Sequence, residues 1–316
     1  MPATVLEEVH RYAFVAMASR HELHVWAPDR AYADRAARAA IADVLRIEGK
    51  FTRYRDASVT STINRNAGGG AVAIDAETVA LLRYADRCHA LSEGRFDLTS
   101  GVLRRAWDFK RRPPRVPADT EIAALLELID WPRVEWDEHS IRLPRVGMEL
   151  DFGGIGKEYA ADRATAILRE HGIAHALVNL AGDVRVVGAH PDGTPWRVGI
   201  QHPRETGGVV ATVELADGAV ATSGDYERYF EVGGKRYSHL LDARTGRPVA
   251  HWQSVSVVAE LATLAGSYAT LAMLFAADAP SFLAREGAHY LAIAADGTMA
   301  ANMPFLQGTP WPHPTG

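Results

Sequence analysis

The residues best suited to chemistry gather in one short segment, 151–157, with the sequence Asp-Phe-Gly-Gly-Ile-Gly-Lys. Glycines between a predicted strand and a predicted helix let the backbone approach a ligand closely, because they carry no side chain. The N–H groups at the start of the helix and the amine of Lys157 both favour a negative charge. The segment therefore suits a phosphate or pyrophosphate, although a tight glycine turn followed by a solvated lysine explains the same residues.

This segment differs from the common nucleotide-binding motifs. A P-loop needs glycine where this chain has Asp151, and serine or threonine where it has Glu158. The spacing does not match the Rossmann G-x-G-x-x-G pattern either. The sequence also has no H-E-x-x-H and no G-x-S-x-G, so a zinc protease or nucleophile-elbow hydrolase is not indicated. The single cysteine, Cys88, lies in a helical pattern and is expected to be a buried structural thiol.

Three further segments carry polar groups beside predicted turns. In residues 238–246, His239 and Asp242 could bind the polar edge of a ligand. Alternatively, Asp242 could accept hydrogen bonds from its own turn. Residues 223–229 could begin a strand with packed aromatic side chains, or form a ligand wall lined by backbone. Residues 95–99 place Phe96 next to Asp97, a pair too common to indicate a function by itself.

Helices and strands alternate along the chain, which predicts an α+β fold with one mixed sheet and flanking helices. A single domain is expected over residues 1–303, followed by a Pro-rich tail over 304–316. We expect helices over 31–48, 78–92, 119–128, 157–171 and 263–276. We expect strands over 147–152, 176–180, 184–187, 196–201, 209–215, 253–259 and 290–294, and hairpins that join 134–136 to 141–143 and that turn at 233–234 within 229–241.

Composition excludes several classes of partner. The 316 residues include 34 Lys and Arg against 39 Asp and Glu, a net charge of −5 that argues against nucleic-acid binding. The N-terminus has acidic residues where a signal peptide needs positive charge, so a cytoplasmic protein is expected. The uncharged stretch 261–277 contains glycine and hydroxyl residues and is predicted to be a buried core helix, not a membrane span.

The motifs, taken in order, resemble those of the FAD:protein FMN transferase (ApbE-like) family. The resemblance covers nearly the whole chain and implies an ApbE-like, T-fold-related architecture. It implies an enzyme that moves FMN from FAD to a Ser or Thr of an acceptor protein, with Mg²⁺ and with release of AMP. The matching motifs are Phe51-x-x-Tyr-Arg, Glu93-Gly-x-Phe-Asp-Leu-Thr-x-Gly, Asp151-x-Gly-Gly-Ile-x-Lys-x-Tyr-Ala-x-Asp, Asn179-x-x-Gly-Asp, Thr222-Ser-Gly-Asp-Tyr-Glu-Arg and His239-x-x-Asp-x-x-Thr-Gly.

The resemblance also implies roles for individual residues. Lys157, His239 and Thr270 would be catalytic, and Mg²⁺ would bind the carbonyl of Gly154 and the hydroxyl of Thr270. The residues implied to bind FAD are Met17, Tyr54, Arg95, Phe96, Asp97, Asp151, Lys157, Asp225, Leu240 and Asp242.

One departure concerns the metal. The family's late helix has the pattern Ala-Asp-Ala-x-x-Thr, whereas this chain has Gly266 in place of the metal-binding aspartate. Mg²⁺ favours carboxylate oxygen, so this loss bears directly on activity. Smaller departures include Glu158, which stands where the family has glycine. The alternatives to an active transferase are therefore an FAD-binding protein with little or no transfer, and a hydrolase of the FAD pyrophosphate.

Overall fold

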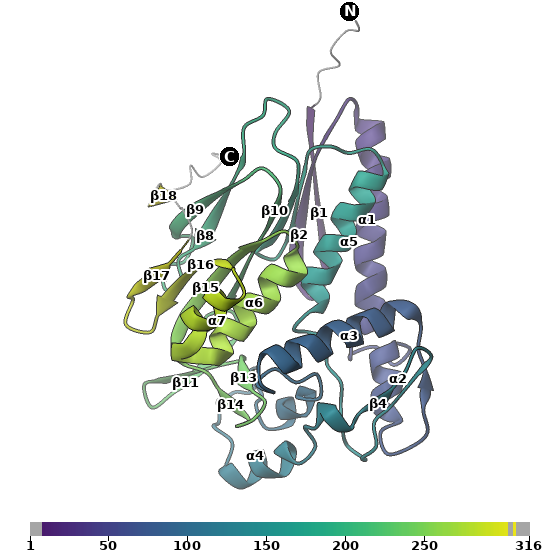
Figure 1. The fold of residues 1–316 in the computed structure, drawn as a ribbon, viewed down its shortest axis with the longest axis vertical. Coiled ribbons are helices and arrows are strands. Elements are labelled where there is room, and N and C mark those ends of the chain that lie inside the picture. The colour runs from purple at the N-terminus through teal and green to yellow at the C-terminus, as the bar shows by residue number, and fades with distance from the viewer. Residues whose placement is uncertain (1–7, 303–305, 308–316) are drawn as a thin grey trace, which may run out of the picture.

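A computed structural model describes residues 8–302 and 306–307. Its centre is an eight-stranded sheet in the order β1-β2-β6-β7-β10-β15-β16-β17 (Figure 1). The α+β class is confirmed. Each neighbouring pair of strands is antiparallel where we expected a mixed sheet, because hairpins and returning helices reverse the chain at each step. The strands are β1 (Glu8–Ala16), β2 (Ser19–Ala27), β6 (Ala176–Leu180), β7 (Asp183–Val187), β10 (Gly218–Gly224), β15 (Trp252–Ala259), β16 (His289–Ala294) and β17 (Met299–Ala301).

Three helices cover one face of this sheet: α1 (Arg30–Phe51), α5 (Gly156–Glu170) and α6 (Ala262–Phe275) (Figure 1). Their buried faces are rich in alanine, which lets the helix backbones approach each other and the sheet closely. Because α6 buries nearly its whole surface, it is the core helix predicted from the sequence. No helix in the described part of the chain is long and apolar enough to cross a membrane.

A second, smaller sheet covers the opposite face. It consists of β8 (Trp196–Gln201), β9 (Val209–Leu215) and β18 (Leu306–Gln307). Val184 and Val186 of β7 pack against it, whereas the neighbouring Val187 packs in the helix-side core. This alternation follows from strand geometry, in which successive side chains point to opposite faces. Both faces of the central sheet are therefore buried at β7, whereas alternate residues of β1 and β2 remain exposed at the sheet edge.

Most of the remaining elements lie below α1, α5 and α6 in Figure 1, whereas α7 lies beside α6. A 3-10 turn, η1, spans Gly101–Arg105, and two others, η2 and η3, span Trp131–Arg133 and Ala276–Asp278. The helices and short strands here are α2 (Val59–Arg65), α3 (Ala76–Leu91), α4 (Asp119–Leu126), α7 (Ala279–Arg285), β3 (Val72–Ala73), β4 (Glu135–Trp136), β5 (Ser140–Arg142), β11 (Tyr229–Val232), β12 (Lys235–Ser238), β13 (Leu241–Asp242) and β14 (Arg247–Pro248).

The predicted strand over 147–152 is wrong. This segment makes only one isolated bridge, between Glu149 and Ser100. Asn64 bonds the segment instead: its side chain accepts from the N–H of Leu150 and donates to the carbonyl of the same residue. The polar backbone groups are thus satisfied without a neighbouring strand. The hairpin β1–β2 and the helix α2 were not predicted.

The tail assigned to residues 304–316 lies mostly outside the described residues. Leu306 and Gln307 are described, and they pair with Thr212 and Ala211 of β9. The acidic N-terminal residues that weighed against a signal peptide also lie largely outside the described part.

Candidate active site at one end of the sheet

The antiparallel register brings several motif residues to the same end of the central sheet. The turn between β1 and β2, the turn between β6 and β7, and the end of β10 at Gly224 all lie there, because the strands alternate in direction. Met17 and Ala181 adopt positive φ angles of 50° and 54° in these turns. Such angles are uncommon for residues with a side chain and mark backbone held by its surroundings. The site is thus built on closely constrained turns.

The glycine turn at 151–157 opens helix α5 at this end. Asp151 accepts a hydrogen bond from the N–H of Gly153 (2.9 Å) and forms an ion pair with Arg53 (2.5 Å). A Cβ on Gly154 would lie 3.0 Å from the ring of Phe96, so this turn and Phe96 are in close contact. No side chain caps the first turn of α5. The helix therefore presents its N-terminal end without a built-in acceptor, as an anion-binding site requires.

Lys157 lies in the first turn of α5, and its side chain is partly buried. Its Nζ lies 2.7 Å from Oδ2 of Asp183, which is 2% exposed. Although burial lowers the pKa of Lys157, the carboxylates of Asp183 and Glu158 raise it above its ordinary value. The lysine is therefore a charged, ion-paired group, and the solvated lysine that the sequence also allowed is not what the structure shows.

The position of Glu158 was not predicted from the sequence. It is only 8% exposed, and its pKa is raised by burial and by the neighbouring charge of Asp183. Its side chain lies against the backbone of Gly266 on α6. One indication of this contact was present in the sequence: Glu158 and Gly266 both depart from the family pattern.

Thr270 lies one turn after Gly266 on the same helix. Its hydroxyl is 2.8 Å from the hydroxyl of Ser223 on β10. Since α6 packs on this strand, Thr270 lies at the same end of the sheet as Lys157 and Asp183. The fold thus brings residues from three distant segments to one end of the sheet, and their catalytic roles stay predictions.

His239 and Leu240 join β12 to β13, beside the site. The N–H of His239 donates to the carbonyl of Arg228 (2.9 Å), and its ring Nδ1 is 3.3 Å from the same oxygen. Burial, aided by the charge of Arg228, lowers the pKa of His239 to about 4. His239 is therefore a neutral imidazole at neutral pH. Next to it, the carbonyl of Leu240 accepts a hydrogen bond from the N–H of Val249.

Asp242 closes its own turn. Its side chain accepts from the N–H of Arg244 (2.8 Å), and its carbonyl accepts from the N–H groups of Thr245 and Gly246. This is the simpler of the two roles that the sequence allowed. A contact of Asp242 with FAD stays a prediction.

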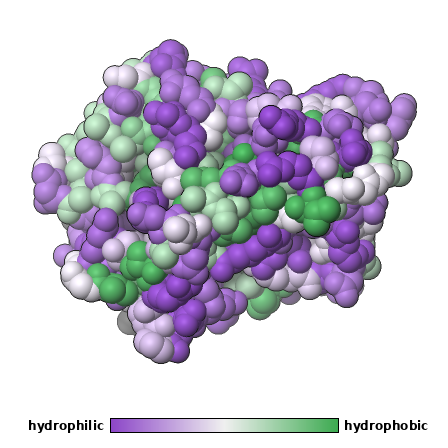
Figure 2. All heavy atoms as spheres, turned by 90° about the horizontal axis from the view of Figure 1, so that it is seen from below, coloured by the Kyte–Doolittle hydropathy of each residue, from purple (hydrophilic) through white to green (hydrophobic). Residues whose placement is uncertain are grey.

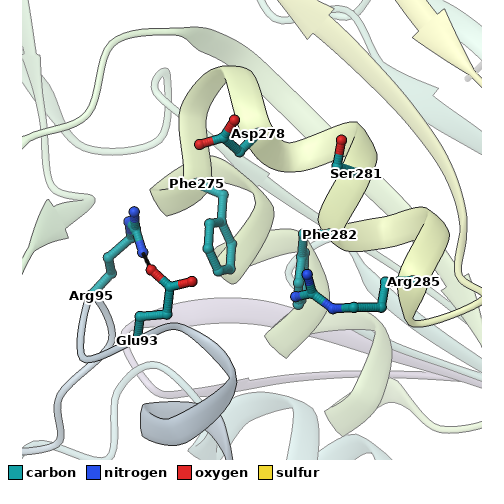
Figure 3. Close-up of a pocket in the computed structure, with 7 residues that line it drawn as sticks. All are labelled: Glu93, Arg95, Phe275, Asp278, Ser281, Phe282 and Arg285. Carbon is teal, nitrogen blue, oxygen red and sulfur yellow. Dashed lines mark hydrogen bonds and ion pairs between the residues drawn. The ribbon is translucent and has the colours of Figure 1, made fainter.

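Arg95 faces a cavity of about 240 Å³ below α6 and α7 (Figure 3). Its guanidinium lies 4.6 Å from the centre of the Phe275 ring and bonds the carboxylate of Glu93 (2.7 Å). Asp97, two residues on, points into the fold instead. Its oxygens accept from Thr99 and from the N–H of Trp131. Asp97 therefore holds this loop, and its contact with FAD stays a prediction.

Asp225 lines a second cavity of about 390 Å³, where it forms a two-bond ion pair with Arg204. Tyr54 is 78% exposed, and the N–H of Met17 donates to Glu48. On the face seen from below, hydrophobic side chains form a broken band bordered by hydrophilic ones (Figure 2). Of the predicted FAD-binding residues, Arg95 and Asp225 thus line two different cavities and Tyr54 lies on the exposed surface.

A divalent cation is compatible with the residues at the start of α5. Among the described residues, no three His, Cys, Asp or Glu side chains come close enough to hold a metal ion. However, Mg²⁺ commonly takes only one or two carboxylates together with substrate phosphates. The buried Oε2 of Glu158 has no hydrogen-bond partner in the described structure. An unsatisfied buried carboxylate oxygen fits a hard cation.

Comparison with known proteins defines the class. The model of the ApbE family matches residues 17–293, so this chain belongs to the ApbE family. It is 34% identical over 208 residues to an FAD:protein FMN transferase of Vibrio cholerae, which covers 64% of this chain and 62% of that protein. It is 33% identical over 254 residues to one of Klebsiella pneumoniae, which covers 79% of this chain and 77% of that protein. The chain thus spans somewhat less than two thirds of the Vibrio relative.

Solved structures agree with this assignment. The ApbE protein of Thermotoga maritima superimposes with a TM-score of 0.86 at 32% identity, over 93% of this chain and 97% of that chain. The flavinyl transferase ApbE of Pseudomonas stutzeri superimposes with a TM-score of 0.82 at 26% identity, over 93% and 95%. The ApbE-like fold expected from the motifs is therefore confirmed.

Proposed function

We propose that this protein transfers FMN from FAD to a Ser or Thr hydroxyl of an acceptor protein, with Mg²⁺, and releases AMP. The observation that carries the proposal is the open start of α5. There, the first turn of α5 has no side-chain cap, and Lys157 pairs with Asp183 next to the β6–β7 turn. The names of the relatives support the same reaction.

The reaction breaks the phosphoanhydride bond of the FAD pyrophosphate and forms a phosphoester bond to the acceptor. The acceptor oxygen forms a bond to the phosphorus of the FMN half, the bond from that phosphorus to the bridging oxygen breaks, and AMP leaves with the electron pair. Because little covalent chemistry falls to the protein, catalysis depends on positioning and on stabilising negative charge. Lys157 and the N–H groups at the start of α5 supply that positive potential.

The proton of the acceptor hydroxyl needs an acceptor of its own. A carbonyl can only accept a hydrogen bond, so the contact of Nδ1 with the carbonyl of Arg228 places the ring proton of His239 on Nδ1. The neutral ring then presents Nε2 as a proton acceptor. When bound, Mg²⁺ would neutralise charge on the pyrophosphate oxygens; the hydroxyl of Thr270, the carbonyl of Gly154 and a carboxylate of this site would hold it.

The test is a transfer assay with the purified protein. Incubation with FAD, Mg²⁺ and an acceptor protein containing the target Ser or Thr should leave flavin covalently on the acceptor and release one AMP per flavin. Lys157→Met should reduce the rate by about 100-fold or more, in the range for lost transition-state charge stabilisation. Absence of transfer at every Mg²⁺ concentration would contradict the proposal.

The glycine at position 266 favours a second candidate, an FAD-binding protein with little transfer activity. In that case FAD binds equally well with and without a chelator, and no acceptor is modified. Hydrolysis of FAD is distinguished by AMP that appears without any acceptor.

A further inference from the structure

Glu158 is a buried acid without a matching cation. Its Oε2 is inaccessible to solvent and takes no hydrogen bond in the described structure. The nearby cation, Lys157, forms its ion pair with Asp183 at 2.7 Å. Buried charges in proteins are normally paired or bound to a metal, because an unpaired one loses its hydration without compensation. The arrangement therefore lacks positive charge at Glu158, and both burial and the charge of Asp183 raise the pKa of its carboxyl, so that without a cation the protonated form is favoured.

The position of Glu158 depends on the glycine opposite it. A Cβ built on Gly266 would lie 2.4 Å from Cγ of Glu158 and 3.0 Å from its Cδ and Oε1. Real Cβ atoms do not come so near, so any residue other than glycine at 266 would displace the glutamate. The carboxylate of Glu158 thus occupies space that a side chain on α6 would otherwise take.

We propose that Glu158 supplies, from α5, a carboxylate ligand for a divalent cation, in the space that Gly266 leaves open on α6. The two unusual residues then form one functional pair: the ligand has moved from one helix to the other. The cation would lie beside Asp183 and within the site that binds the FAD pyrophosphate. This inference rests on the proposed function, since the phosphates would complete the ligand set.

The structure carries this proposal through three independent features. The carboxylate is more than nine-tenths buried, one of its oxygens is unpartnered, and the facing helix provides a gap instead of a side chain. Mg²⁺ sites with one or two carboxylates and substrate phosphates need no larger cluster of acids. With Glu158 as the ligand, transferase activity is compatible with glycine in place of the aspartate at position 266.

Cation binding can be measured directly with Mn²⁺ as the probe, by electron paramagnetic resonance of the free ion in the presence of FAD. Wild-type protein should bind Mn²⁺, and Glu158→Gln should weaken binding by at least about tenfold. Glu286→Gln is the matched control, because Glu286 is also a largely buried carboxylate in a helical region but bonds Tyr268. It should bind Mn²⁺ as wild type does.

A helix-to-helix exchange gives a sharper test. Glu158→Ala should lose Mn²⁺ affinity, and the double variant Glu158→Ala with Gly266→Asp should recover it to within about threefold of wild type, because the carboxylate returns from α6 into the emptied space. Melting temperatures of all variants establish that they are folded. If the double variant fails to fold, the Mn²⁺ affinity of Glu158→Gln, a substitution of nearly equal volume, decides whether Glu158 is a ligand.

FAD binding, followed separately by flavin fluorescence in chelator, distinguishes two failures. If wild-type protein does not bind FAD, the proposed function is overturned. If FAD binds but Mn²⁺ binds equally to wild type and Glu158→Gln, or to neither, only the ligand role of Glu158 is overturned.

Discussion

The loop at Asp97 and the contact between α5 and α6 each bury a carboxylate, but they treat it differently. Asp97 is 6% exposed and Glu158 is 8% exposed. Asp97 accepts three hydrogen bonds, two from Thr99 and one from Trp131, and lies 3.5 Å from the ring of His89. Glu158 has an oxygen with no partner in the described structure. Two carboxylates of similar burial therefore differ in role. Asp97 stabilises the fold through its hydrogen bonds, whereas Glu158 has an oxygen available to a ligand.

The largest expected effect comes from removing the satisfied acid. Asp97→Ala leaves the N–H groups of Thr99 and Trp131 buried without an acceptor, and should lower the free energy of unfolding by about 3 kcal/mol. Urea denaturation measures the change, with Asp108→Ala on the exposed surface as control. A loss below about 1 kcal/mol would show that Asp97 is not the fixed point of its loop.

A methyl group at position 266 tests the packing of the other acid. Gly266→Ala should lower the free energy of unfolding by about 2 kcal/mol, because its Cβ would overlap Cγ of Glu158. In a Glu158→Ala background the same change should be neutral or stabilise by up to about 1 kcal/mol, since alanine favours helix over glycine. A double-mutant cycle in urea gives the coupling. Equal costs in both backgrounds would contradict a direct contact between the two positions.

Removing the acid of Glu158 should act in the direction opposite to Asp97→Ala. With a chelator present, Glu158→Gln should leave the free energy of unfolding unchanged or raise it by about 1 kcal/mol, because it removes an uncompensated buried acid. Thermal unfolding measures the difference. A fall of 2 kcal/mol would mean that Glu158 is a structural acid like Asp97, and the distinction between the two regions would be lost.

His239 extends the comparison to a partly buried base and gives the smallest effect. Since burial lowers its pKa from 6.5 to about 4, the unfolded chain takes up a proton between these pH values and the folded chain does not. The stability contributed by His239 is therefore complete above pH 6.5 and falls as the pH drops toward 4. His239→Gln should flatten this part of the stability curve, and the ring signals in an NMR titration should move near pH 4 instead of near pH 6.5.

The sequence predicted much of the fold because most elements carry a strong local pattern. Helix α1 and strand β15 were predicted to within a few residues, since their apolar spacing is regular. Strand β1 was missed because its exposed positions interrupt the apolar pattern. The segment at 147–152 looks like a strand but binds Asn64 instead, a contact between distant residues that no local pattern reveals.

The site was predictable as a set of motifs but not as a set of contacts. The lysine at 157 was expected at the phosphates; its ion pair with Asp183 depends on the β6–β7 turn folding back to the start of α5. In the sequence, Glu158 and Gly266 are two separate departures from a pattern. Only the packing of α5 on α6 shows that they occupy the same space.

The proposed function depends most on the pyrophosphate of FAD binding at the start of α5. Isothermal titration of FAD and of riboflavin, which has no phosphate, into wild-type protein and Lys157→Gln tests this directly. Lys157→Gln should weaken FAD binding by about tenfold or more, as the loss of a charge-assisted contact should, and leave riboflavin binding unchanged. Equal FAD affinity of the two proteins would contradict it.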